Sequence, residues 1–132
     1  MLNRVAPACS PELELLVSRT IGCAIRVHRT LGPGYTEGLY QDAMGIELEM
    51  EGLRYERELT IRVTYRGRAL RAQRLDLVVE DQLVVELKAV ERLEPVHQAQ
   101  LLSYMKAGSF KVGLLMNFHS ELLKSSLRRF IL

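Results

Sequence analysis

The segment VVELKAV, residues 84–90, has the apolar character of a strand buried in a sheet, yet it carries Glu86 and Lys88. Because side chains alternate across a strand, these two residues share one face with Val84. Charged groups on a buried face need partners, since burying an unpaired charge is costly. The segment therefore predicts both a core strand and a polar site on one of its faces.

A second acid, Asp76, lies between two leucines in the preceding segment LDLVV, residues 75–79. If the two strands pair through the EDQ turn, both acids can lie on one face, near the strand ends away from the turn. Two partly buried carboxylates repel each other, so a cation is needed to offset them. Lys88 is one candidate and a divalent metal is another; ligands without cysteine or histidine favour Mg²⁺ or Mn²⁺. The structural alternative is that Glu86 and Lys88 emerge at a strand end and that Asp76 pairs with an arginine.

Length and composition are those of an ordinary globular protein. The chain has 132 residues, of which 48% are hydrophobic and 26% are charged, so we expect one domain over residues 1–132, with residues 1–10 as a flexible tail. No apolar run reaches the roughly 18 residues that cross a bilayer, and the N-terminus lacks an apolar segment of signal-peptide length. A cytoplasmic protein is expected. Its two cysteines, Cys9 and Cys23, are expected to be free thiols.

The formal net charge is +2, but positive charge is concentrated in one part of the chain. Seven arginines lie at positions 54, 57, 62, 66, 68, 71 and 74. Guanidinium groups offer bidentate hydrogen bonds to phosphate, which favours a surface for nucleic acid. The alternative interpretation is the solvated face of a two-stranded ribbon, and the arginines alone do not decide between the two.

Hydrophobic periodicity predicts a helix over residues 11–31, capped by Ser10, and a second helix over residues 37–51. The second helix has Leu39, Ala43, Ile46 and Met50 on one face. Later elements are strands over 55–65, 69–79 and 84–90, a helix over 95–107, a strand over 110–118, and a short helical turn with a last edge strand. The order α-α-β-β-β-α-β predicts an α/β protein with a mixed central sheet flanked by helices.

Asp76 followed by ELK at residues 86–88 resembles the PD-(D/E)xK nuclease superfamily, whose restriction-endonuclease-like core runs α-β-β-β-α-β. The segment QLLSY, residues 100–104, is similar to the Q-x-x-x-Y helix motif of RecB-type members. GYTEGLY, residues 34–40, fits G-x-x-E-x-x-Y, and nearly the whole chain resembles the small bacterial GxxExxY family.

The resemblance implies a role for six residues. Glu37, Asp76 and Glu86 would be metal ligands, Lys88 the catalytic lysine, and Gln100 and Tyr104 would orient the substrate or the attacking water. It further implies hydrolysis of phosphodiester bonds with Mg²⁺, or with Mn²⁺, and a nucleic-acid substrate, DNA rather than RNA. A departure is Leu75, which precedes Asp76 where the superfamily pattern has proline.

Other interpretations are open. Tyr104 can be a packed helix residue, and His28 can pack instead of shaping the site. The small size of the chain fits a non-catalytic module that binds nucleic acid or a protein partner, while the complete acidic set favours an enzyme. A homodimer, formed through the sheet edge or the arginine-rich ribbon, would enlarge the binding surface. An enzyme on small phosphate esters is a third possibility, weakened by the lack of a glycine-rich phosphate loop.

Overall fold

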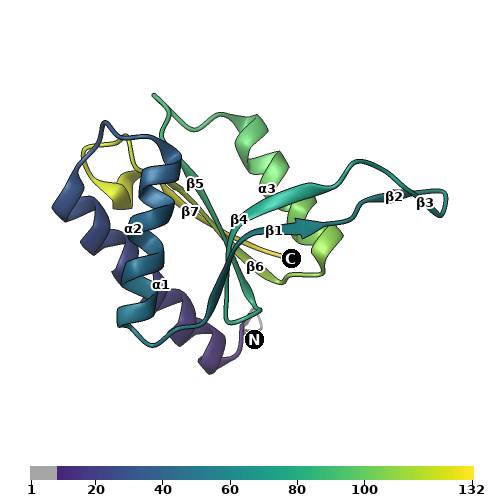
Figure 1. Cartoon of the computed structure of the whole chain (residues 1–132), viewed down its shortest axis with the longest axis horizontal. Coiled ribbons are helices and arrows are strands. Elements are labelled where there is room, and N and C mark those ends of the chain that lie inside the picture. The colour runs from purple at the N-terminus through teal and green to yellow at the C-terminus, as the bar shows by residue number, and fades with distance from the viewer. Residues whose placement is uncertain (1–8) are drawn as a thin grey trace, which may run out of the picture.

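The structure is a computed structural model that describes residues 9–132, in which helices cover both faces of a five-stranded sheet (Figure 1). Its elements are α1 (Pro11–Leu31), α2 (Glu37–Met50), β1 (Tyr55–Ile61), β2 (Thr64–Tyr65), β3 (Arg68–Ala69), β4 (Gln73–Val79), β5 (Leu83–Lys88), α3 (Pro95–Gly108), β6 (Val112–Asn117), the 3₁₀ helix η1 (Leu123–Ser126) and β7 (Leu127–Ile131).

The main sheet has the strand order β1-β4-β5-β6-β7. Strands β1, β4 and β5 are antiparallel neighbours, α3 makes the crossover to the parallel strand β6, and β7 returns antiparallel at the other edge. The predicted element order, the mixed sheet and the last edge strand are therefore confirmed.

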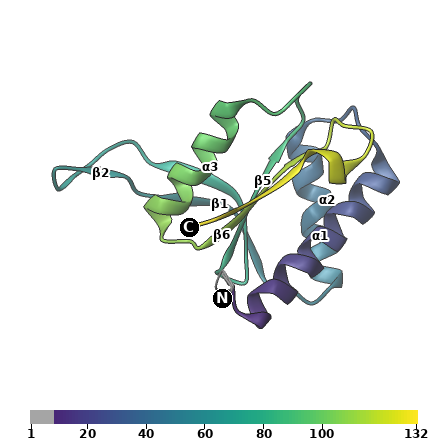
Figure 2. The same ribbon diagram turned by 180° about the vertical axis from the view of Figure 1, so that it is seen from behind.

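The two faces of the sheet form two apolar clusters. Helices α1 and α2 pack on one face, where β5 contributes Val85 and Leu87, while α3 packs on the other, where β5 contributes Val84. Figure 2 shows the same layers from behind. The predicted alternation along β5 is confirmed, and it directs Glu86 and Lys88 toward the side of α3.

Helix α1 begins where the sequence predicts, because the Ser10 Oγ accepts a hydrogen bond from the Leu13 N–H at 3.1 Å. The predicted tail reaches too far, since Cys9 is buried and Ser10 is the helix cap; the rest of that prediction lies outside the described residues. Cys9 and Cys23 are both free, as expected. No helix within residues 9–132 is long and apolar enough to pass through a membrane.

The predicted buried face of α2 is wrong. Ile46 is 59% exposed and Met50 is 78% exposed, whereas Tyr40, Met44 and Leu48 are fully buried. Both rows repeat every three or four residues, so periodicity alone could not choose between them. The choice is made by Tyr40, which stacks on Phe118 with 4.6 Å between ring centroids and donates its hydroxyl proton to the Gly32 carbonyl.

The predicted long hairpin also differs in detail. Strand β1 ends at Ile61, and beyond it β2 and β3 form a separate two-stranded ribbon that projects from the body of the protein (Figure 1). Its turn is made by Arg66 and Gly67, whose φ angles of 52° and 79° suit the tight turns of β-hairpins. The turn lies between the predicted strands over 55–65 and 69–79, and Arg68 already belongs to β3.

The corrected face of α2 can be tested with two substitutions in the same helix. Leu48→Ala should lower the free energy of unfolding by about 2 to 5 kcal/mol, because it empties a packed position. Ile46→Ala should change it by less than about 0.5 kcal/mol, because that side chain is mostly in water. Urea unfolding monitored by circular dichroism measures both, and comparable losses would contradict the orientation of α2.

Candidate functional site

The two acids meet where the backbone ladder between β4 and β5 stops. The strands pair from Val79 opposite Leu83 to Leu77 opposite Val85, and the next residues are Asp76 and Glu86. There the Asp76 N–H donates to Glu86 Oε1 at 2.9 Å. The Leu87 N–H donates to Asp76 Oδ2, also at 2.9 Å. Each carboxylate thus takes the place of a main-chain carbonyl of the opposite strand, and both acids are fixed between the strands.

The neighbouring strand β1 is irregular at the same level. Glu58, which would lie opposite Asp76, has a φ of 52° and is missing from the paired register. Leu75 packs in the cluster with α3, whereas Leu77, two residues later, packs in the cluster with α1 and α2. In a regular strand these two leucines would share a face, so β4 changes face at Asp76.

The acids influence each other's protonation. Burial raises the pKa of Glu86 to about 8, and the negative charge of Asp76 adds to the rise. Burial also raises the pKa of Asp76, with a further contribution from the charge of Glu37, while the Leu87 N–H and the Lys88 ammonium oppose the rise. The positive charge of Lys88 also opposes the rise in the pKa of Glu86. The charge of Lys88 therefore does not cancel the effect of burial and of the neighbouring acid, and Glu86 keeps its proton up to a pH of about 8.

Glu37 approaches this site from the first turn of α2, where a negative charge complements the helix dipole. Its Oε2 accepts a hydrogen bond from the Ala89 N–H at 3.3 Å, just beyond the end of β5. Gly34, three residues earlier, has a φ of 117°, which glycine adopts more readily than other residues. The residues of the G-x-x-E-x-x-Y pattern thus hold the start of α2 against the ends of α1 and β5.

Gln100 and Tyr104 lie one helical turn apart on α3 and are joined to each other. The Gln100 Nε2 donates to the Tyr104 hydroxyl at 2.9 Å, and that hydroxyl donates to Gln73 Oε1 at 3.1 Å. Burial raises the pKa of Tyr104, and the charges of Glu86 and Asp76 contribute. The tyrosine therefore lies on the side of the sheet where the charges of the acids reach it.

Two polar residues of this region were missed by the sequence analysis. Gln73, at the start of β4, links Tyr104 to the strand that carries Asp76. Asn117, only 2% exposed at the end of β6, lies opposite Lys88. Its amide donates to the Val90 carbonyl at 2.8 Å and accepts from the Val90 N–H at 3.0 Å, which fixes the chain that leaves β5. A polar residue ending an apolar strand was the signal that could have found Asn117.

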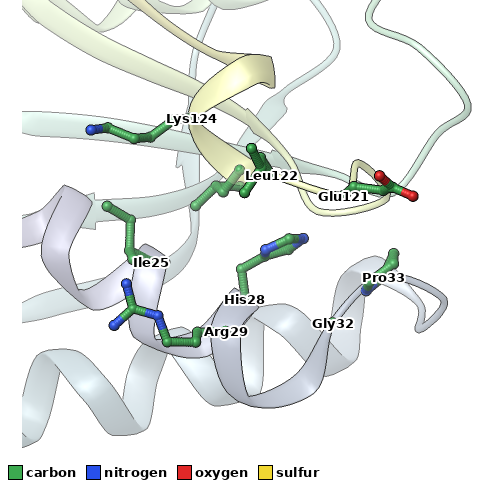
Figure 3. Close-up of a pocket in the computed structure, with 9 residues that line it drawn as sticks. Ile25, His28, Arg29, Gly32, Pro33, Glu121, Leu122 and Lys124 are labelled. Carbon is green, nitrogen blue, oxygen red and sulfur yellow. The ribbon is translucent and has the colours of Figure 1, made fainter.

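His28 lies apart from the acids. It borders a pocket of about 460 Å³ between the end of α1 and residues 121–124, which Figure 3 shows in close-up. Its Nε2 is 2.7 Å from the Ser120 carbonyl, and its ring lies 6.1 Å from that of Phe118. The side chain is buried, so the packing interpretation is confirmed for His28.

The donor chemistry at Asp76 and Glu86 fits a hard dication, because it consists of carboxyl oxygens in a place where a second negative charge needs a cation to offset it. Within residues 9–132, no three or more acidic, histidine or cysteine side chains converge as a complete ligand set. Mg²⁺ commonly binds through one or two carboxylates and takes its remaining ligands from water and substrate phosphates. The arrangement agrees with that mode of binding.

Comparison with known proteins gives one strong match. A family model described as the PD-(D/E)XK nuclease superfamily matches residues 14–130, which include all six candidate site residues. The narrower GxxExxY family stays a prediction. No curated protein matches the chain. A solved structure titled "Crystal structure of SSO0001" is similar at 15% identity over 93% of this chain and 78% of that one, with a TM-score of 0.49. A similarity this weak supports no statement about the site.

The raised pKa of Glu86 predicts how the stability of the metal-free protein depends on pH. The folded state keeps a proton that the unfolded state, with an ordinary pKa near 4.5, releases. The contribution of Glu86 to stability should therefore be greatest below pH 4.5. It should fall as the pH rises from there to about 8, by at most about 1.4 kcal/mol per pH unit. Glu86→Gln cannot ionise and should lose less stability over this range.

Urea unfolding of both proteins in a chelating buffer, at several pH values from 5 to about 8, measures the difference. The free energy of unfolding of the variant should increase relative to that of the wild type as the pH rises, because only the wild type acquires the buried charge at residue 86. A difference in stability that is the same at every pH would contradict the raised pKa.

Proposed function

The chain belongs to the PD-(D/E)XK nuclease superfamily, and from this premise we propose that it hydrolyses phosphodiester bonds of nucleic acid with the help of Mg²⁺ or Mn²⁺. The observation that carries the proposal is the pair of carboxylates, Asp76 and Glu86, that the strands hold together, with the charge of Lys88 lowering the pKa of both. In the metal-free protein the proton that Glu86 keeps up to a pH of about 8 relieves the repulsion between the two carboxyl groups, and a bound dication would take the place of that proton.

In the proposed reaction, Asp76 and Glu86 would hold the metal ion, with Glu37 as a third acid nearby. When bound, the ion supplies a Lewis acid for the phosphoryl group and makes the attacking water more acidic. Lys88 follows Glu86 by two residues on β5, where its positive charge would stabilise the negative charge that develops on the phosphoryl oxygens.

Gln100 and Tyr104 are proposed as positioning residues for the substrate. Gln100 is exposed, so its amide can reach a phosphate oxygen, while its bond to the Tyr104 hydroxyl limits its movement. Tyr104 is in turn held by Gln73 on the strand of Asp76. The substrate contact on α3 is thereby tied to the strand that carries the metal ligand.

A second candidate is a module that binds nucleic acid or a protein partner without catalysis. The observation in its favour is that both carboxylates already accept main-chain hydrogen bonds. They would be useful to the fold even if no metal ever bound. The two candidates differ in metal binding and in cleavage, and each can be measured separately.

Cleavage is the direct test of the proposal. With MgCl₂ or MnCl₂, the purified protein should cleave duplex DNA, and a chelator should stop it. Glu86→Gln removes a metal ligand and Lys88→Met removes the stabilising charge, so each should lower the rate by at least about 100-fold. Rates are measured with fluorescent oligonucleotides, and with RNA of the same sequence to compare substrates.

The matched controls are Glu12→Gln on α1 and Lys106→Met on α3. Both residues are exposed and make none of the hydrogen bonds of the site, so these variants should cleave like the wild type. Equal cleavage by the wild type and both site variants would identify a contaminating nuclease and defeat the proposal.

Metal binding gives a test that needs no substrate. Because a ligand that binds the folded state stabilises it, MgCl₂ or MnCl₂ should raise the melting temperature of the wild type at pH about 8 by several degrees. The shift should be lost in Glu86→Gln and in Asp76→Asn, and kept in Glu12→Gln. A wild type that melts at the same temperature with and without either metal would favour the non-catalytic module.

A further inference from the structure

Strands β2 and β3 and the residues that join them to the sheet form an arm, which we call the arginine arm and define as residues 62–72. Residues 64–72 are exposed without exception. Thr64 pairs with Ala69, Tyr65 pairs with Arg68, and the Leu70 N–H donates to the Val63 carbonyl at 2.8 Å, so the arm has a regular backbone. Figures 1 and 2 show the arm extending from the end of β1 and the start of β4, away from α1 and α2.

The arm concentrates positive charge that the rest of the fold does not use. It contains Arg62, Arg66, Arg68 and Arg71 and no acidic residue. Within the described part of the chain, none of these four arginines forms an ion pair.

The other three arginines of the arginine-rich segment differ from these four. Arg54 pairs with Glu80 and Asp81, Arg57 with Asp42, and Arg74 with Glu58. Four like charges on a narrow ribbon repel one another, and contact with an anionic partner would relieve that repulsion.

The arm is continuous with the candidate site. Strand β4 leaves the arm at Gln73, whose side chain is bonded to Tyr104, and reaches Asp76 three residues later. Five residues separate Arg71 from Asp76, which corresponds to roughly 17 Å along an extended strand. Since phosphates follow one another by about 3.4 Å along the axis of a DNA strand, the arm would begin about five nucleotides from the acids.

We propose that the arginine arm binds the phosphate backbone of double-stranded DNA beside the bond that the acids cleave; the cleavage rests on the function proposed above. The ribbon geometry favours B-form DNA, because its major groove is wide enough for a two-stranded β-ribbon, whereas that of A-form RNA is deep and narrow. Single strands are bound largely by stacking on aromatic side chains, and Tyr65 is the one aromatic residue of the arm. The contact is electrostatic and does not read sequence.

The salt dependence of DNA binding tests the arm without any cleavage. Binding to a fluorescent duplex of about 24 base pairs is measured by anisotropy in a chelating buffer, between about 50 and 200 mM NaCl. Removing one arginine that binds a phosphate should reduce the slope of log affinity against log salt by about 0.9. Arg66→Gln/Arg68→Gln should therefore reduce the slope by up to about 1.8 and weaken binding at low salt by at least about tenfold.

The matched control is Arg54→Gln/Arg57→Gln, which removes the same net charge from arginines that are already paired. The slope of log affinity against log salt should change in this control by less than half of the change in Arg66→Gln/Arg68→Gln. An equal change in both double variants, or no duplex binding by the wild type, would overturn the proposal. So would an arm effect of the same size on an RNA duplex or on single-stranded DNA. Melting curves confirm that each variant is folded.

The outcome separates the two proposals. A protein that cleaves DNA while its arm variant binds duplex like the wild type would contradict the role of the arm alone. A protein that binds duplex through its arm but never cleaves would contradict the nuclease alone.

Discussion

The arrangement of the site depends on two hydrogen bonds that cross between β4 and β5. A main-chain N–H inside a sheet must have an acceptor, because leaving it unpaired costs roughly 1 to 3 kcal/mol. Where the backbone ladder ends, the carboxylates of Asp76 and Glu86 supply those acceptors for the opposite strand. The fold therefore holds the two acids together, and the energetic cost is visible in Glu86, whose pKa is raised to about 8. The interaction that completes the sheet is also the one that accumulates negative charge.

Three elements limit how this charge can be compensated. Strand β5 brings Lys88 to the acids, but α2 adds a third carboxylate, that of Glu37, whose charge raises the pKa of Asp76 further. Helix α3 contributes neutral groups, the hydroxyl of Tyr104 and the amide of Gln100. When Glu86 also ionises, Lys88 offsets only one of the two charges of the pair. The dication proposed above would offset the remaining charge.

The sequence predicted the features that depend on local chemistry. The Ser10 cap located the start of α1, and alternation along the largely buried β5 placed Glu86 on the face of Val84. The predictions from sequence failed where tertiary contacts decide which residues are buried. The buried row of α2 was chosen by the stacking of Tyr40 on Phe118, which no local pattern encodes. The change of face at Asp76 coincides with a positive φ at Glu58 in the neighbouring strand. A glutamate in the sequence does not indicate a backbone with positive φ. The role of Gln73 depends on its hydrogen bond to Tyr104, which is distant in the sequence, so no local pattern could identify it.

The position of the arginine arm follows from the same electrostatics. Carboxylates that attract a metal ion also repel a polyanionic substrate, so a site of this kind needs positive charge close by but outside the acid cluster. In or directly before the strands around the acids, Arg54, Arg57 and Arg74 are already paired with acidic side chains. The four arginines of the arm lie on a segment that joins β4 at Gln73, three residues before Asp76. In the proposed complex they would attract the phosphates that flank the reacting one without neutralising the acids, which are held between the strands.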